Sequence, residues 1–199
     1  AAAMEGSRLL IKDVGLNPTR TAILKVLSRM GAHMTEILHS TDGEPIGNIE
    51  IHGAPLTGTT LLPEEIPNLI DEIPVIAVAA ALAKGPTHIR NARELRVKET
   101  DRIATTVENL RKMGVDVEEF EDGMIVHGRG KLKAASIESH GDHRIAMAFS
   151  IAGLFADGET VIQGVDCINT SYPGFAHHLE AIRNERRDVA DFILPTTAP

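Results

Sequence analysis

The feature that most constrains the fold of this chain is a unit that recurs three times along its 199 residues. Each copy has a glycine that ends a stretch of small apolar residues, then a short apolar alternation, then a polar cluster. The glycines are Gly6, Gly85 and Gly158. The polar clusters read NPTR, VKETDR and NTSYPGF, and in each copy thirteen residues separate the glycine from Thr19, Lys98 or Ser171. Such a repeat indicates a domain assembled from one supersecondary unit.

A second similarity indicates what the unit contains. The segments VLSRMGAHMTEI (26–37) and ENLRKMGVDVEEF (108–120) both read as the end of an amphipathic helix, a glycine stop and a strand. The patterns GNIEIHG and GMIVHGRG are typical of hairpins between copies. The unit is therefore predicted to be helix, strand, helix, strand, which makes the chain an α/β protein. The first copy is expected to open inside a helix at Ala1, as if cut from something longer.

The repeat pattern also predicts where the domain lies along the chain. We expect one domain over residues 1–185 and a loose tail over 186–199, because the third copy has no glycine stop and the chain closes on LPTTAP. Two segments, IPVIAVAAALA and IAMAFSIAGLFA, are apolar on nearly every face. Helices of that kind are buried on all sides, so we expect a helical core covered by sheets.

Composition excludes several classes of function. No apolar run approaches the roughly 20 residues that a bilayer span needs, and no signal peptide is evident, so we expect a cytoplasmic protein without a membrane partner. A net charge of −8 and few aromatic residues argue against a nucleic-acid-binding function. The lone Cys167 cannot form an internal disulfide, and the pair His140 and His143 lacks an evident third metal ligand.

Cations gather at one predicted helix start, in RELRVKETDRI (93–103). The apolar stripe of Ile103, Val107, Leu110 and Met113 predicts a helix over about 99–113. Arg96, Lys98 and Arg102 would then surround its first turn, where each cation costs about 0.3–1 kcal/mol against the helix dipole. This pattern favours a site for a phosphate or carboxylate. Glu99, a carboxylate among these cations, is a candidate acid or base.

Other predicted helix starts carry similar residues. Asp142 is expected to cap a helix that opens with His143 and Arg144. The remaining two starts are NPTR, with Asn17 as cap, Pro18 at the first helical position and Arg20 following, and IDEIPVIAV, with Asp71 as cap before Pro74. Each residue alone could be a plain cap or a solvated charge. If these starts share one face, that face would bind small phosphorylated acids.

Four motifs together resemble a known family. RVKETDR, DEIPVIAVAAALAKG, GDHRIAMAFSIAGL and the terminal SYPGF are similar to the C-terminal half of the EPSP synthase family of the shikimate pathway, which serves aromatic amino-acid biosynthesis. The resemblance implies an inside-out lobe of three βαβαββ repeats, the enolpyruvyl transferase fold, with buried helices and outer sheets. It implies a transferase that moves the carboxyvinyl group of phosphoenolpyruvate to the 5-hydroxyl of shikimate 3-phosphate without metal or other cofactor.

The resemblance also implies roles for single residues. Asp71 would be the base beside the 5-hydroxyl, and Glu99 would exchange a proton with C3 of phosphoenolpyruvate. The substrate-binding residues would be Lys98 for shikimate 3-phosphate and Arg102, His143 and Arg144 for phosphoenolpyruvate. The chain departs from the family at Thr170, where many members have lysine. Since the family's N-terminal lobe is missing, that lobe is an expected partner, and the isolated chain is expected to be inactive.

Alternative functions stay open on the sequence. The sister transferase that acts on UDP-N-acetylglucosamine has a similar fold, but RVKETDR fits the shikimate branch better. RNA 3′-phosphate cyclases contain related repeats, which the acidic charge disfavours. A non-catalytic domain or a binding module for anionic metabolites that retains the fold is the alternative from another functional class.

Overall fold

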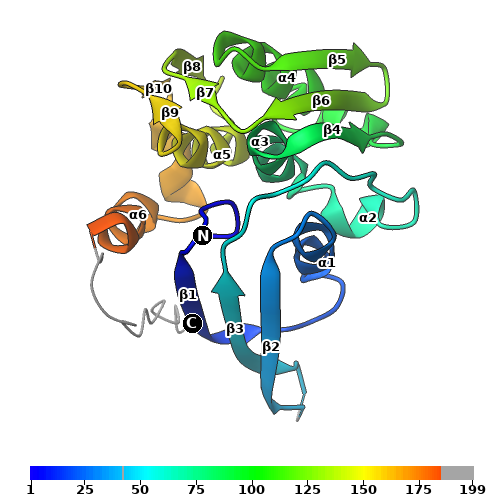
Figure 1. The fold of residues 1–199 in the computed structure, drawn as a ribbon, viewed down its shortest axis with the longest axis vertical. Coiled ribbons are helices and arrows are strands. Elements are labelled where there is room, and N and C mark those ends of the chain that lie inside the picture. Colours follow the sequence, from blue (N-terminus) through cyan, green and yellow to red (C-terminus); the bar gives the residue numbers. More distant parts are fainter. Residues whose placement is uncertain (42, 185–199) are drawn as a thin grey trace. The chain divides into compact units, whose positions relative to one another are not determined.

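The computed structural model describes residues 1–41 and 43–184, so the predicted tail at 186–199 lies outside the described residues. The chain divides into two compact units. Unit 1 contains Ala1–Pro55 together with the described residues from Ala176 onward, and unit 2 contains Leu56–Phe175. The helix α6 (Phe175–Asn184) begins at the end of unit 2 and continues into unit 1. Figure 1 shows the elements of both units.

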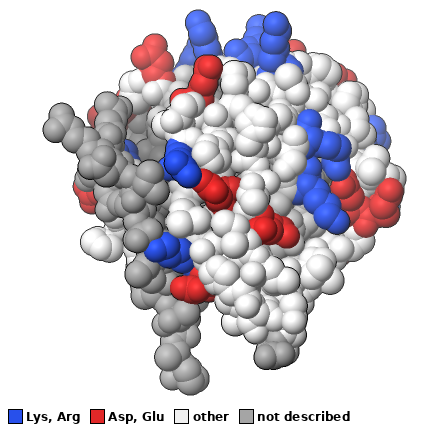
Figure 2. All heavy atoms as spheres, turned by 60° about the horizontal axis from the view of Figure 1, so that its bottom comes forward, with Lys and Arg blue, Asp and Glu red and all other residues white. Residues whose placement is uncertain are grey.

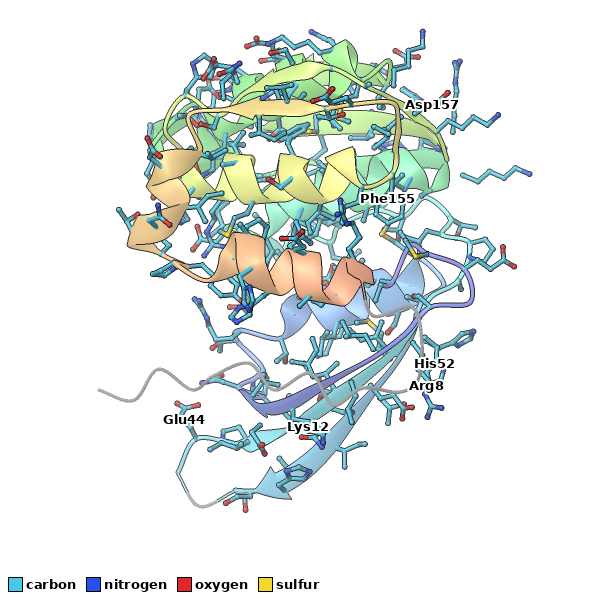
Figure 3. The ribbon with its side chains drawn as sticks, turned by 90° about the vertical axis from the view of Figure 1, so that its left-hand side faces the viewer. Arg8, Lys12, Glu44, His52, Phe155 and Asp157 are labelled. Carbon is cyan, nitrogen blue, oxygen red and sulfur yellow. The ribbon has the colours of Figure 1, made fainter. Side chains whose placement is uncertain are left out.

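Unit 1 contains one antiparallel sheet and the helix α1 (Ala22–Arg29). Its strands are β1 (Arg8–Gly15), β2 (His33–Ser40) and β3 (Ile46–His52), in the order β1-β3-β2. The small core of this unit is formed by Leu16, Ile49 and Ile51. At one end of the sheet Arg8 lies opposite His52 (Figure 3), and both side chains contact the Glu50 carboxylate, at 2.6 Å and 3.0 Å.

Unit 2 is built from helices, one three-stranded antiparallel sheet and two short parallel strand pairs. Its α-helices are α2 (Ile66–Leu69), α3 (Ile73–Leu82), α4 (Arg102–Lys112) and α5 (His143–Gly153), and its 3₁₀ helices are η1 (Arg93–Val97) and η2 (Val165–Thr170). The sheet contains β4 (Lys84–Ile89), β6 (Gly123–Arg129) and β5 (Asp116–Phe120), in that order. The parallel pairs are β7 (Leu132–Lys133) with β9 (Ala156–Asp157), and β8 (Ser136–Glu138) with β10 (Val161–Gln163).

The predicted repetition is visible in the topology. The orders β1-β3-β2 and β4-β6-β5 are the same, and in both copies an α-helix, α1 or α4, connects the outer strands. The three repeat glycines also share a backbone conformation, with φ of 76° at Gly6, 93° at Gly85 and 105° at Gly158. A side chain is strained in this region, so glycine is the residue that suits all three positions. The third copy differs, because its strand β10 pairs with β8 in parallel.

The two apolar segments form helices, as predicted. In α3 most residues are buried, because this helix packs between strand β6 and helix α5 (Figure 1). In α5 one side is buried, through Ile145, Ala146, Ala148, Phe149 and Ala152, while Met147 and Ile151 are half-buried. The all-round burial predicted from composition therefore holds for α3 more fully than for α5. The predicted inside-out α/β class is confirmed.

Two predictions in unit 1 are wrong. Residues 1–6 form turns rather than the end of a helix, with the Met4 amide donating to the Ala1 carbonyl at 2.9 Å. Asn17 does not cap a helix that starts at Pro18, because α1 starts only at Ala22. The Asn17 side chain instead accepts hydrogen bonds from the Thr19 amide and hydroxyl, at 3.0 Å and 2.8 Å. Local bonds of this kind favour a turn over a helix, so Arg20 lies in a turn.

A search for membrane spans found no helix, within residues 1–41 and 43–184, with the length and apolar character needed to cross a bilayer.

The close packing of β6 on α3 leads to a first prediction. A Cβ atom at Gly128 would lie 2.1 Å from the Ala80 oxygen and 2.3 Å from the Ala83 oxygen, and backbone atoms cannot easily move away. We expect Gly128→Ala to lower the free energy of unfolding by about 1–3 kcal/mol, measured by urea denaturation. The matched control is Gly15→Ala, since a Cβ there meets nothing within 4 Å. Equal stability of the two variants would contradict this packing argument.

Candidate active site

The starts of α3, α4 and α5 meet within unit 2, and the side chain of Arg102 connects them. Its Nη1 lies 3.1 Å from Oδ1 of Asp71, just before α3. Its Nε lies 2.7 Å from Oδ2 of Asp142, just before α5, and its Nη2 lies 2.6 Å from Oε2 of Glu99. Arg144 joins the same group, because its Nη2 lies 3.7 Å from Oδ2 of Asp71. The structure therefore brings together Asp71, Glu99, Arg102 and Arg144, which come from three of the four predicted helix starts.

Arg102 and Asp142 form a buried ion pair at the centre, with side chains 1% and 0% exposed. Asp142 also caps α5 as predicted, since its Oδ1 accepts from the amides of Arg144 and Ile145 at 2.9 Å and 3.4 Å. Burial by itself would raise the pKa of Asp142, but the hydrogen bond and charge of Arg102, with the two amides, hold this pKa below its ordinary value. Asp142 is therefore ionised at neutral pH.

The two candidate acid–base groups lie at the edge of this ion pair, where a substrate can reach them. The Glu99 side chain is 51% exposed and the Asp71 side chain is 32% exposed. Both contact Arg102, whose pKa is raised because its carboxylate partners outweigh the opposing effect of burial. One fixed cation thus orients two accessible carboxylates, an arrangement suited to moving one proton at each of two substrate atoms.

Arg144 supplies a guanidinium beside Asp71. Its Nη1 donates to the Asp71 carbonyl at 2.9 Å and lies 3.4 Å from Oε1 of Glu72, and its side chain is 26% exposed. His143, the first residue of α5, is half-buried next to it in the chain. Asp71 was predicted to cap α3, and this prediction is wrong. Glu72 takes that position without a side-chain cap, because the Asp71 carboxylate turns to the two arginines.

The start of α4 differs from its prediction. The helix begins at Arg102 rather than near Glu99, because Asp101 caps it by accepting from the Ala104 amide at 2.9 Å. The predicted apolar stripe is buried, with each of its four residues at most 1% exposed. Lys98 follows η1 outside α4, and its Nζ contacts Oε1 of Glu94 at 2.5 Å.

The cations that predicted an anion site all have carboxylate partners within the chain, Lys98 through Glu94. Arg96 is held by the carboxylates of Asp101 and Glu119, at 2.8 Å and 3.1 Å, and by the carbonyls of Phe120 and Glu121. Arg102 is neutralised by its own three carboxylates. Spacing along the sequence carries no signal for these partners, because Asp142 lies 40 residues from Arg102. Asp142 as the partner of Arg102 is the functional contact that sequence reasoning missed.

A small pocket of about 190 Å³ opens beside the charged group. Asp71 and Arg144 contribute charged groups to its wall, and the rest of the wall is apolar, formed by Pro74, Val75, Met147, Ala148, Ile151 and Phe175. Thr170, the position where the sequence departs from the motif, is the last residue of η2, and its hydroxyl donates to the Cys167 carbonyl at 2.7 Å.

Charge on the face shown in Figure 2 is divided into small groups. Figure 2 shows a face on which acidic and basic side chains alternate between broad uncharged areas. Within the part of the chain that the structure describes, no three His, Cys, Asp or Glu side chains are grouped so that they could hold a metal ion.

The depressed pKa of Asp142 predicts how stability depends on pH. Such a group stabilises the fold fully above its unfolded pKa of about 3.9, and this contribution is lost as the pH falls through the lower folded value. We therefore expect the stability difference between the unmodified chain and Asp142→Asn to be largest at pH 7 and to shrink below about pH 4. Urea denaturation across this range measures it. A difference that stays constant down to pH 3 would contradict the assignment.

Comparison with known proteins extends this picture. Residues 1–179 match the family model described as EPSP synthase (3-phosphoshikimate 1-carboxyvinyltransferase). A 3-phosphoshikimate 1-carboxyvinyltransferase of Akkermansia muciniphila is 59% identical over 97% of this chain, and a second of Desulforamulus reducens is 53% identical over 92% of it. The chain spans 43% of the length of each of these two relatives.

Solved structures agree with the sequence relatives. An EPSP synthase from Acinetobacter baumannii superposes with a TM-score of 0.85 at 42% identity, over 89% of this chain and 42% of that one. The enolpyruvyl transferase NikO from Streptomyces tendae superposes with a TM-score of 0.69 at 19% identity, over 91% of this chain and 40% of that one. The second likeness shows a shared fold.

Proposed function

The chain belongs to the EPSP synthase family, and on that premise we propose that it forms one lobe of a 3-phosphoshikimate 1-carboxyvinyltransferase. The whole enzyme would transfer the carboxyvinyl group of phosphoenolpyruvate to the 5-hydroxyl of shikimate 3-phosphate and release phosphate, in the cytoplasm. The observation that carries this proposal is the meeting of three helix starts, where Asp71, Glu99 and Arg144 surround the buried Arg102. We assign residues 1–185 to this lobe.

In the proposed mechanism the two carboxylates divide the proton transfers. In the first step Asp71 takes the proton of the 5-hydroxyl while the oxygen of that hydroxyl bonds to C2 of phosphoenolpyruvate. Glu99 gives a proton to C3. In the second step Glu99 removes a proton from C3, the C2–O bond to phosphate breaks and the double bond re-forms. Positioned groups of this kind each contribute about 10²–10⁴-fold in rate. The contacts of both carboxylates with Arg102 support the proposal, because they hold the two groups at one surface before the substrates bind.

The substrate anions would be held by the cations at the same surface. Arg144 is partly exposed and lies beside Asp71, so we assign it, with His143, to phosphoenolpyruvate. Lys98 is assigned to shikimate 3-phosphate, since its present contact with Glu94 is an ion pair near the surface, worth at most about 1 kcal/mol and readily exchanged. Arg102 is 1% exposed and already paired, so it would reach phosphoenolpyruvate by releasing the carboxylate of Glu99.

The second lobe would supply the rest of the site. The chain spans less than half of the length of its relatives. A site with one wall leaves the substrates open to water. We therefore propose that the isolated chain is inactive and that an N-terminal lobe is its partner.

A complementation experiment tests this function. The chain is mixed with the separately produced N-terminal part of the Akkermansia muciniphila relative, and phosphate release from phosphoenolpyruvate is measured with shikimate 3-phosphate present. We expect release in the mixture and none from either part alone. If the two parts bind each other and shikimate 3-phosphate but release no phosphate, the alternative of a non-catalytic binding module is supported instead.

A further inference from the structure

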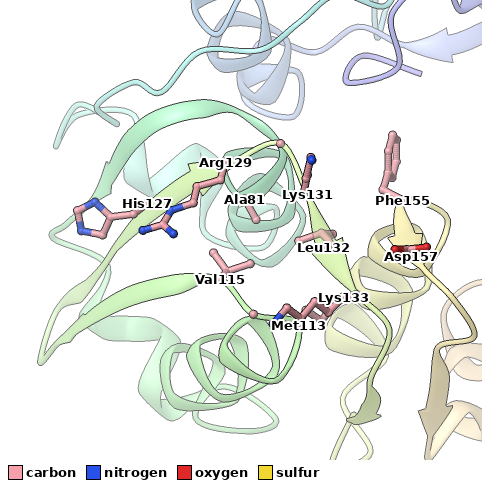
Figure 4. A pocket seen from close by; sticks show the side chains of 12 residues that line it. Ala81, Met113, Val115, His127, Arg129, Lys131, Leu132, Lys133, Phe155 and Asp157 are labelled. Atoms are coloured by element: carbon pink, nitrogen blue, oxygen red, sulfur yellow. The ribbon is translucent and has the colours of Figure 1, made fainter.

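A second and larger pocket lies at the opposite ends of the same three helices. It has a volume of about 550 Å³ and is lined by residues at the ends of α3 and α4 and just beyond α5, including Ala81, Met113 and Phe155 (Figure 4). Organic ligands commonly occupy pockets of about 300–1,000 Å³. The helix starts that carry the candidate active site therefore do not contribute to this pocket, and the proposed reaction gives it no role.

Three cations line this pocket. Arg129 ends strand β6, and Lys131 and Lys133 follow it along the chain. Among residues 1–41 and 43–184, no carboxylate lies within ion-pair distance of these three side chains. The arginines of the candidate active site differ, because each already contacts a carboxylate. In Figure 4 the side chains of Lys131 and Phe155 point in the same direction.

The ends of the helices limit the charge that a ligand can bring. Each helix C-terminus carries about half a negative charge, so α3, α4 and α5 together contribute about −1.5. Asp157, opposite Lys133 in the β7–β9 pair, adds one more negative charge. The three cations remain only slightly in excess, which suits a ligand with a single negative charge rather than a polyphosphate.

Apart from His127, which contacts Glu118, the side chains of the remaining wall are apolar. Met113, Val115 and Leu132 are buried residues that line the pocket, and Phe155 is half-buried across from them. The aliphatic part of Lys133 covers Gly114, where an added Cβ would lie 3.0 Å from the lysine Cδ. A ligand would thus meet cations at the rim and apolar side chains below them.

From these features we propose that this pocket binds a small organic acid with one carboxylate and an apolar ring. The carboxylate would contact Lys131 and also Arg129, whose exposed side chain would turn from His127 toward it, and the ring would pack against Val115, Leu132 and Phe155. The proposal does not depend on the transferase activity, since it uses none of the residues assigned to that reaction.

The test uses 3-phenylpropionate as the probe and the 199-residue chain as the protein. In an NMR titration we expect a dissociation constant in the low millimolar range, as for other ligands of this size, with the largest amide shifts at residues 130–133. Two probes separate the contributions, since acetate lacks the ring and 3-phenylpropan-1-ol lacks the charge. Both are expected to bind at least tenfold more weakly. Equal binding of the alcohol, or shifts confined to residues 142–145, would overturn the proposal.

Variants provide the second arm of the test. The double variant Arg129→Gln/Lys131→Gln should weaken 3-phenylpropionate binding about tenfold, since it removes both contacts to the carboxylate. The matched control is Arg20→Gln/Lys25→Gln, which removes the same charge from unit 1 and should leave binding unchanged. Circular dichroism checks that both variants fold. If the two double variants bind the probe equally, the pocket is not the site.

Discussion

Asp142→Ala is expected to lower the free energy of unfolding of this chain by about 3–5 kcal/mol. The substitution removes the cap of α5 and leaves the guanidinium of Arg102, 1% exposed, without its buried carboxylate partner. Asp71 and Glu99 still contact Arg102, but both are partly exposed and cannot replace two buried hydrogen bonds. Urea denaturation followed by circular dichroism measures the loss.

Two further variants separate the cap from the charge. Asp101 caps α4 in the same way and also pairs with Arg96, but it is 38% exposed, so Asp101→Ala should cost only about 1–2 kcal/mol. Adding Arg102→Leu to Asp142→Ala should restore part of the lost stability, because the unpaired charge is then absent. If Asp142→Ala and Asp101→Ala have equal effects, the buried ion pair has no special weight in this fold.

Glu99→Gln is expected to reduce kcat of the reconstituted enzyme by about 10²–10⁴-fold and to change the KM values only a few-fold. The glutamine keeps an oxygen that can accept from Arg102, so the local geometry is preserved, but it cannot give or take the proton at C3. The same variant should slow the exchange of the C3 hydrogens of phosphoenolpyruvate with deuterated water. Steady-state assays in the complementation mixture, together with mass spectrometry of the recovered substrate, measure both effects.

The control for Glu99 is Glu108→Gln. Glu108 also contacts a cation, Lys112 at 2.6 Å, but it lies further along α4 and its side chain is 50% exposed. Its substitution should leave kcat within about twofold, as expected for a surface ion pair. Loss of activity of similar size in both variants would point to folding rather than proton transfer, and activity of Glu99→Gln close to that of the unmodified enzyme would remove Glu99 from the mechanism.

Local patterns were sufficient to predict several parts of this molecule. The glycine register at Gly6, Gly85 and Gly158 reflects a backbone conformation that each residue adopts by itself, so it is readable in the chain. The stripe from Ile103 to Met113 and the cap at Asp142 also depend on neighbours within one or two helical turns. Caps and turns were harder to predict from the sequence. The side-chain oxygen of Asn17 could accept hydrogen bonds from the first turn of a helix or, as observed, from Thr19 in a local turn.

By itself the sequence determined the α/β repeat, the buried stripe of α4 and the charged residues near the starts of α3, α4 and α5. Only the tertiary structure decided which charges pair, placing Arg102 against Asp71, Glu99 and Asp142 and joining Arg96 to Asp101 and Glu119. The physical reason is that helix periodicity acts over a few residues, whereas an ion pair forms between any segments that packing brings within a few ångströms.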